Sequence, residues 1–109
     1  MAYDKTLADR IRALLPIEGD FSERTMFGGV GFLLNGNMCV GVWKEELILR
    51  LSPEQSDEAL LDPTVRPFDI TGRPMTGWVL VGPDGTESDE ALRAWIDRSV
   101  EYVSLLPAK

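Results

Sequence analysis

The side chains with most scope for chemistry in this chain are Cys39, Arg50 and Arg73. A thiol beside a guanidinium ionises more readily, and the thiolate is the nucleophilic form of cysteine. Period-two alternation of the surrounding residues predicts that Cys39 lies near Arg50 on one face of a sheet. Arg73 stands in a Gly-Arg-Pro loop, where it would bind a carboxylate or phosphate ligand, or pair with Asp69. The alternative for Cys39 is a buried, unreactive strand residue.

The chain contains no histidine and only one cysteine. Histidine is the commonest general base near neutral pH and the commonest metal ligand. Serine–histidine and cysteine–histidine catalysis are therefore excluded, and a zinc site would need carboxylates alone. The acidic residues between 84 and 90 do not match a calcium-loop spacing and suit the first turn of a helix. We expect a protein that is not an enzyme and has neither a cofactor nor a metal.

The glycines at 28, 29, 31 and 41 do not form a phosphate-binding loop, because no lysine follows them and no strand–loop–helix order surrounds them. Glycines within strands instead mark bends, bulges or close packing. Period-two alternation runs from Glu23 to Leu51, and Asn35-Gly36 is the dipeptide preferred by a tight hairpin turn. A second turn at Lys44-Glu45 would place Val42 beside Leu47.

The Asn35-Gly36 turn sets a strand register, because the turn length fixes which residues lie opposite one another. In this register Leu33 faces Met38, Phe32 faces Cys39, and Gly31 faces Val40. The face that we expect to be the core then carries Leu33, Met38, Val40, Val42, Leu47 and Leu49. The opposite face carries Val30, Phe32, Cys39, Trp43, Ile48 and Arg50.

Helices and further strands flank these hairpins. Helical spacing of apolar residues predicts a first helix over residues 3–15, with Asp4 as its cap, and a last helix from Ser88 to about residue 105. Ser52-Pro53-Glu54-Gln55 begins a short helix that stops before residue 63. Strands are expected over 66–71 and 78–81, with turns at 71–74 and 82–85. This order predicts one α+β domain over residues 1–109, with two layers: an antiparallel β-sheet and helices packed on one face.

The formal net charge of −7 bears on possible partners. Nucleic-acid binding and adhesion to anionic membranes both depend on clustered lysine and arginine, and no basic run is present. We therefore expect no direct nucleic-acid partner and no membrane partner. No apolar stretch is long enough for a transmembrane helix or a signal peptide, and a lone cysteine suits a reducing compartment, so we expect a cytoplasmic protein.

Three segments together resemble one known family: Met26-Phe27-Gly28-Gly29, the Asn35-Gly36 hairpin with Met38-Cys39, and Thr71-Gly72-Arg73-Pro74-Met75 with Gly77-Trp78. The chain is similar over nearly its whole length to the TfoX N-terminal domain family. The resemblance implies a secretion-chaperone-like α+β fold and a link to bacterial regulators of competence for DNA uptake. Those regulators carry a C-terminal helical domain that this chain lacks, so we expect a stand-alone domain. The family supplies no catalytic residues.

An apolar sheet face without helices is typical of an interface. We therefore expect a non-enzymatic protein-interaction module with a regulatory role, which binds a protein partner or forms a homodimer. One alternative is a small-molecule-binding or weakly enzymatic domain with a pocket near Cys39, Arg50 and Arg73. Another is a component of a DNA-linked, competence-type transcriptional regulator that acts through a partner. The alternative to an interface is that loops cover this sheet face, or that the true register differs by one residue, so that no apolar patch is exposed.

Overall fold

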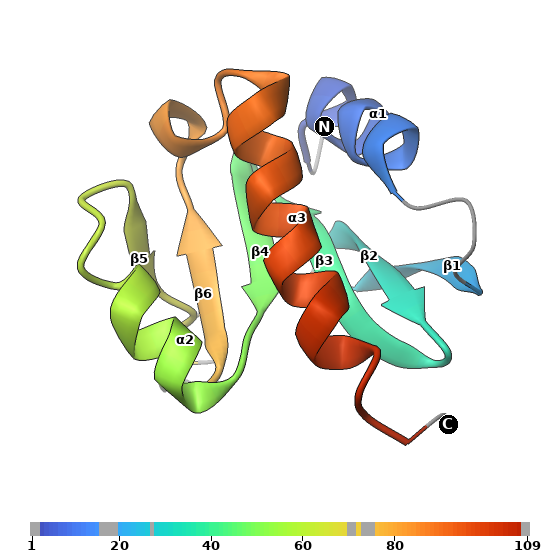
Figure 1. Ribbon diagram of the computed structural model, residues 1–109. Helices are drawn as coiled ribbons and strands as arrows, with labels where there is room; N and C mark the ends of the chain where they lie inside the picture. Colours follow the sequence, from blue (N-terminus) through green and yellow to red (C-terminus); the bar gives the residue numbers. More distant parts are fainter. Residues whose placement is uncertain (1–2, 16–19, 27, 70–71, 73–75, 108–109) are drawn as a thin grey trace.

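The described part of the chain folds around a six-stranded antiparallel sheet with the strand order β1-β2-β3-β4-β6-β5 (Figure 1). The computed structural model describes residues 3–15, 20–26, 28–69, 72 and 76–107. The elements are α1 (Lys5–Leu14), β1 (Phe21–Met26), β2 (Gly29–Leu34), β3 (Asn37–Trp43), β4 (Glu46–Arg50), α2 (Pro53–Ala59), β5 (Val65–Pro67), β6 (Trp78–Val81) and α3 (Asp89–Val103). A short 3-10 turn, Pro83–Gly85, joins β6 to α3.

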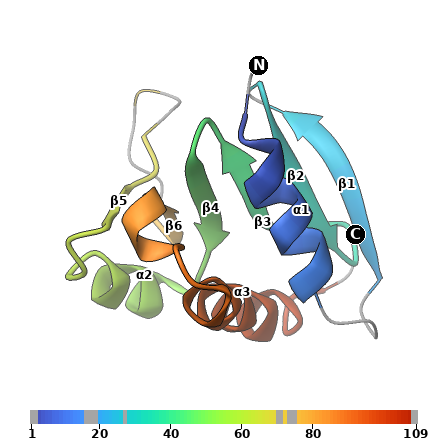
Figure 2. The same ribbon diagram turned by 90° about the horizontal axis from the view of Figure 1, so that it is seen from above.

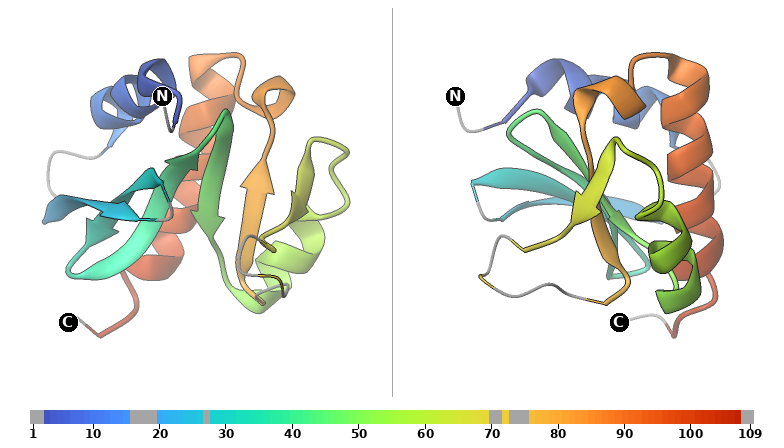
Figure 3. Two further views of the ribbon diagram at one scale, coloured as in Figure 1. Left: turned by 180° about the vertical axis from the view of Figure 1, so that it is seen from behind. Right: turned by 90° about the vertical axis from the view of Figure 1, so that its left-hand side faces the viewer.

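The helices lie on one side of the sheet. α3 crosses β3 and β4, α1 packs between α3 and the β1–β2 end, and α2 lies beside β6 (Figure 2). Seen from behind, the strands face the viewer with α1 and α3 beyond them (Figure 3). We call the face of the sheet that is turned to the viewer in this view the helix-free face. The predicted two-layer α+β fold is confirmed.

Side-chain caps begin the three helices as the sequence predicts. The backbone N–H of Leu7 donates to Asp4 Oδ1 at 3.1 Å. Ser52 Oγ accepts from the Gln55 N–H at 3.2 Å, and Ser88 caps α3 in the same way. Each cap satisfies a backbone donor that the helix cannot, which is typically worth about 1 kcal/mol.

The two predicted hairpin turns are also confirmed. Asn35 and Gly36 adopt φ values of 54° and 84°, the left-handed conformation that this turn requires. Lys44 adopts a φ of 56°, which is uncommon for a residue with a side chain. The N-terminal segment supports that turn, because the N–H of Asp4 donates to the Lys44 carbonyl at 2.8 Å.

The predicted register is correct next to the Asn35-Gly36 turn and wrong beyond it. Leu33 pairs with Met38, but the next pair is Phe32 with Val40, so Cys39 is an extra residue in β3. Such a β-bulge turns two successive side chains to the same side of the strand. Cys39 and Val40 are both fully buried toward the helices.

A hydroxyl from α3 completes the hydrogen bonding of this bulge. Ser99 is fully buried, and its Oγ lies 2.7 Å from the Cys39 carbonyl oxygen and 2.8 Å from that of Arg50. These two carbonyls lie where the β3–β4 pairing stops, one residue beyond the Val40–Leu49 pair. Ser99 thus donates to backbone acceptors at the point where the β3–β4 pairing ends.

Because of the bulge, the apolar residues are distributed between the two faces of the sheet differently from the prediction. Val40, Val42, Leu47 and Leu49 face the helices as predicted, in the main core. Leu33 and Met38 were predicted for that core but lie on the helix-free face instead. The register shift lies between their pair and the Phe32–Val40 pair, so the two pairs point to opposite faces of the sheet.

Replacement of Ser99 by alanine should lower the free energy of unfolding by about 1–3 kcal/mol, because it removes the hydroxyl that donates to the Cys39 and Arg50 carbonyls. Urea unfolding followed by circular dichroism measures the loss. The matched control is Ser104→Ala, since the Ser104 hydroxyl also donates to a carbonyl, that of Glu101, but is exposed. Equal losses in the two variants would contradict this role for Ser99.

Candidate interaction surface

The helix-free face holds three of the six residues predicted for an interface, namely Trp43, Ile48 and Arg50. Ile48 is only 1% exposed, so the prediction that it forms part of an exposed patch is wrong. It forms a small second core with Phe68 and Leu80, and half-buried Met38, Trp43 and Trp78 pack around it. Part of the face is thus covered from within the chain, by the segment that follows β5.

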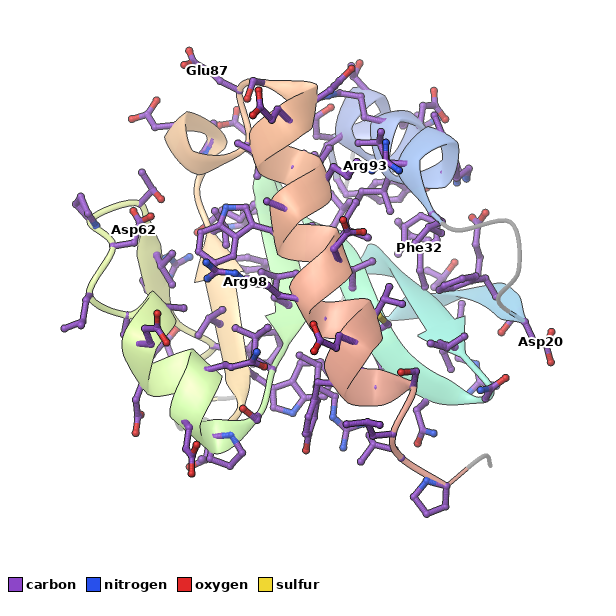
Figure 4. The ribbon with its side chains drawn as sticks, in the orientation of Figure 1. Asp20, Phe32, Asp62, Glu87, Arg93 and Arg98 are labelled. Atoms are coloured by element: carbon purple, nitrogen blue, oxygen red, sulfur yellow. The ribbon has the colours of Figure 1, made fainter. Side chains whose placement is uncertain are left out.

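The other three predicted interface residues, Val30, Phe32 and Cys39, lie on the helix side. They are buried in the main core, with exposures of 5%, 1% and 0%. Phe32 lies between β2 and α1 (Figure 4), and the guanidinium carbon of Arg12 is 5.7 Å from its ring centre. The one-residue shift at the bulge is the physical reason for this correction, and none of the three is available to a partner.

Cys39 is a buried structural thiol. Burial raises its pKa to about 11, against smaller lowering effects from the Ser99 hydrogen bond and the Arg50 charge. Its Sγ lies 3.2 Å from Ser99 Oγ. The predicted pairing of Cys39 with the Arg50 guanidinium on one face is wrong, since the two side chains lie on opposite faces of the sheet.

The outer layer of the helix-free face centres on Arg50 and Trp78, which are paired across β4 and β6. The Arg50 guanidinium carbon lies 5.4 Å from the Trp78 ring centre, and the Phe68 ring centre is 5.8 Å from that of Trp78. Both residues are half-buried. Within the described part of the chain, no carboxylate forms an ion pair with Arg50.

Trp43 is the second aromatic residue of this layer, and two cations lie near its ring. Lys44 Nζ is 4.5 Å from the ring centre and the Arg66 guanidinium carbon is 6.0 Å away. Arg66 also binds both carboxylate oxygens of Glu46, at 2.8 and 2.5 Å, so its charge is largely compensated. The Lys44 ammonium and the Arg50 guanidinium have no such compensation among the described contacts.

The strand register aligns one row of residues across the whole face: Arg24, Gly31, Gly41, Ile48, Leu80 and Arg66. The two glycines leave the middle of the row without side chains. A Cβ atom on Gly41 would lie 2.7 Å from the Val30 carbonyl oxygen and 3.0 Å from Met38 Cε. Glycine is therefore required at position 41, and the flexible Met38 side chain lies beside it on the surface.

Sequence reasoning missed Met38 and Trp78 as members of this surface, and Phe68 as part of the packed layer beneath it. The strand that contains Trp78 was predicted correctly, but nothing in the residue types indicated that it pairs with β4. Arg73, predicted to bind an anionic ligand, lies outside the described residues, as does most of the predicted turn at 71–74.

A shallow, open hollow of about 330 Å³ lies at the end of the sheet, between the β3–β4 turn and the 3-10 turn. Its lining consists of Lys44, Glu45, Glu46, Gly82 and Pro83. Neither Cys39 nor Arg50 reaches it. Among the described residues, no three Cys, Asp or Glu side chains gather closely enough to hold a metal ion. None of the described helices is both long and apolar enough to cross a membrane.

The arrangement of the chain agrees with a comparison to protein families. The model of the TfoX N-terminal domain family matches residues 13–103, from the last turn of α1 to the end of α3. The chain belongs to this family. The match covers every strand of the sheet described here, including the bulge and the row of the helix-free face. No curated protein and no solved structure gave a match.

The stability of the domain should fall as the pH rises from about 9 to about 11, because of Cys39. In the unfolded chain the thiol ionises near its ordinary pKa of 9.0, whereas burial raises the pKa to about 11 in the fold. The unfolded state therefore binds fewer protons in this window, and ionisation favours unfolding. Urea titrations at about pH 8 and pH 10.5 should show a larger loss for the natural protein than for Cys39→Ala. Equal losses would contradict the raised thiol pKa.

Proposed function

We propose that this TfoX N-terminal domain is a non-enzymatic protein-interaction module that binds its partner on the helix-free face. The observation that carries the proposal is the half-buried outer layer formed by Arg50, Trp78, Trp43 and Met38. Tryptophan, arginine and methionine are enriched in protein interfaces, and tryptophan and arginine supply many of the residues that dominate binding energy. Here they are concentrated on a face that none of the described helices covers.

The layer beneath this surface supports the same proposal. Ile48, Phe68 and Leu80 are at most 2% exposed, so the half-buried aromatic rings rest on a packed base. Side chains held in this way lose little conformational freedom on binding, which favours affinity. The surface is thus formed before a partner arrives.

A function based on the reactivity of the Cys39 thiol has less support than a function based on the helix-free face. The thiol is buried, protonated at neutral pH and separated by the sheet from Arg50. A small-molecule or enzymatic site built on these two residues therefore has little support. A regulatory role, which the resemblance to competence regulators implies, would be exerted through a protein contact.

A second copy of the chain is the other candidate partner. A two-fold contact places the same patch of each copy against itself. On this face it would set the basic residues Arg24, Lys44 and Arg50 of one copy against the same basic set of the other, and like charges oppose such a contact. We therefore favour a different protein as the partner.

Light scattering after size exclusion should accordingly give the monomer mass over a wide concentration range. The measurement is made at low and at moderate salt, because screening weakens repulsion between like charges. A stable dimer whose mass reverts to that of the monomer in Trp43→Asp would instead assign the face to self-association.

A photo-cross-linking residue at position 24 should yield a discrete adduct in cells, because Arg24 is exposed on the helix-free face. The matched control carries the same residue at position 93, since Arg93 is exposed on α3 (Figure 4). Adducts only from position 24, identified by mass spectrometry, support the proposal. Adducts from position 93 alone, or equally from both positions, would show that the helix-free face is not the binding surface.

A further inference from the structure

We infer that the partner binds through an acidic, partly apolar segment whose carboxylate pairs with the Arg50 guanidinium against Trp78. This inference rests on the interaction function proposed above and gives the chemistry of the partner at the same face.

Arg50 is the first reason. Arg10 and Arg50 are both half-buried, but Arg10 donates to Asp89 Oδ1 at 3.0 Å and to the Thr86 carbonyl at 2.7 Å. Arg50 has the Trp78 ring as its described partner and no carboxylate. Partial burial of a charge is unfavourable unless the charge is paired. An arriving carboxylate would compensate the Arg50 charge and could bind two of its N–H groups at once.

The cation–π contact with Trp78 prepares Arg50 to bind a carboxylate. A guanidinium held over a ring keeps the N–H groups along its edge available for hydrogen bonds. The ring also limits the number of rotamers, so less side-chain entropy is lost when a carboxylate binds. Trp78 is itself held by Phe68, at 5.8 Å between ring centres.

The charge distribution is the second reason. The helix-free face and its rim carry Arg24, Lys44, Arg50 and Arg66, which are four of the eleven basic residues of the chain. On the same face and rim the described acids are Glu46, Asp69 beside Arg66, and Glu45 next to Lys44 in the β3–β4 turn, which are three of the eighteen acidic residues. The rest of the domain therefore repels an acidic segment, while this face attracts it, which favours one binding orientation.

The aromatic residues define the apolar part of the segment. Trp43, Trp78 and Met38 are half-buried, and each packs against the cluster of Ile48, Phe68 and Leu80. Met38 is flexible and adapts to side chains of different shape. An extended segment lying across β3, β4 and β6 would place apolar side chains against these residues and carboxylates toward the arginines.

Single-stranded nucleic acid also binds surfaces of aromatic and basic residues, by stacking and phosphate contacts. The composition disfavours it here. Several phosphates must be neutralised at once for useful affinity, whereas Glu46 already compensates Arg66 and the whole chain carries a net charge of −7. A nucleic acid is therefore an outcome of the test and not the occupant that we propose.

The test is a selection of phage-displayed random peptides of about twelve residues on the full chain, followed by synthesis of the enriched sequences. We expect enrichment of Asp and Glu together with apolar residues. Amide shifts in NMR spectra should map the bound peptide to β3, β4 and β6. Raising the salt concentration should weaken binding, because the contact is between charges.

Two matched arginine variants then test the role of Arg50. Arg50→Met keeps an apolar stem against Trp78 but removes the charge, and should weaken peptide binding about tenfold or more. The control is Arg98→Met, because Arg98 also lies over a tryptophan, Trp95, at 5.1 Å, but on α3 (Figure 4). It should leave the dissociation constant within about twofold. If Arg50→Met does not fold, Arg50→Lys, which keeps the charge and loses the bidentate geometry, should still weaken binding measurably.

The outcomes separate this inference from the proposed function. Neutral or basic peptides that map to β3, β4 and β6 would overturn the acidic partner while leaving the interaction surface in place. Peptides that map to the helices would overturn both. Tighter binding of an oligothymidylate of similar length, lost in Arg50→Met, would replace the acidic segment with a nucleic acid.

Discussion

The hydroxyl of Ser99 at the Cys39 bulge is the contact on which the organisation of the sheet depends. It joins the middle of α3 to β3 and β4 by binding the carbonyl oxygens of Cys39 and Arg50 at 2.7 and 2.8 Å. Without a donor at this point, the bulge would leave buried acceptors unsatisfied, and a regular ladder would be favoured. A regular ladder would turn every side chain of one strand beyond position 39 to the opposite face. One buried hydroxyl thus helps to decide which residues form the core and which reach the surface.

The chemical difference between the two faces follows from this register. With the bulge present, Phe32 and Val30 join the core beneath α1 and α3, while Trp43 and Gly41 stay on the helix-free face. The core side is apolar and includes a thiol whose pKa burial raises to about 11. The other side combines tryptophan rings with guanidinium and ammonium groups. Tertiary packing of α3 is therefore linked to the composition of a surface on the opposite side of the sheet.

Local signals predicted most of the elements, because caps and tight turns depend on a few adjacent residues. Asp4, Ser52 and Ser88 cap their helices, and Asn35-Gly36 adopts the conformation that its residue types favour. The bulge was missed because Met38-Cys39-Val40 is apolar throughout, so the pattern is the same in either register. The cover over Ile48 was missed because it depends on Phe68, from a segment that pairs only through β6. Both errors concern contacts between residues distant in sequence.

The net charge of a chain can exclude a class of partner only when the charged residues are evenly distributed over the surface. In this domain they are not. A net charge of −7 argues against nucleic acid for the domain as a whole. The strand register nevertheless gathers Arg24, Arg50 and Arg66 on one face, while acidic first turns place carboxylates at the starts of α2 and α3. An approaching segment experiences the nearest charges most strongly, since ions screen those farther than about 10 Å at ordinary salt. An acidic domain can therefore present a basic, aromatic surface, and the register determines where that surface lies.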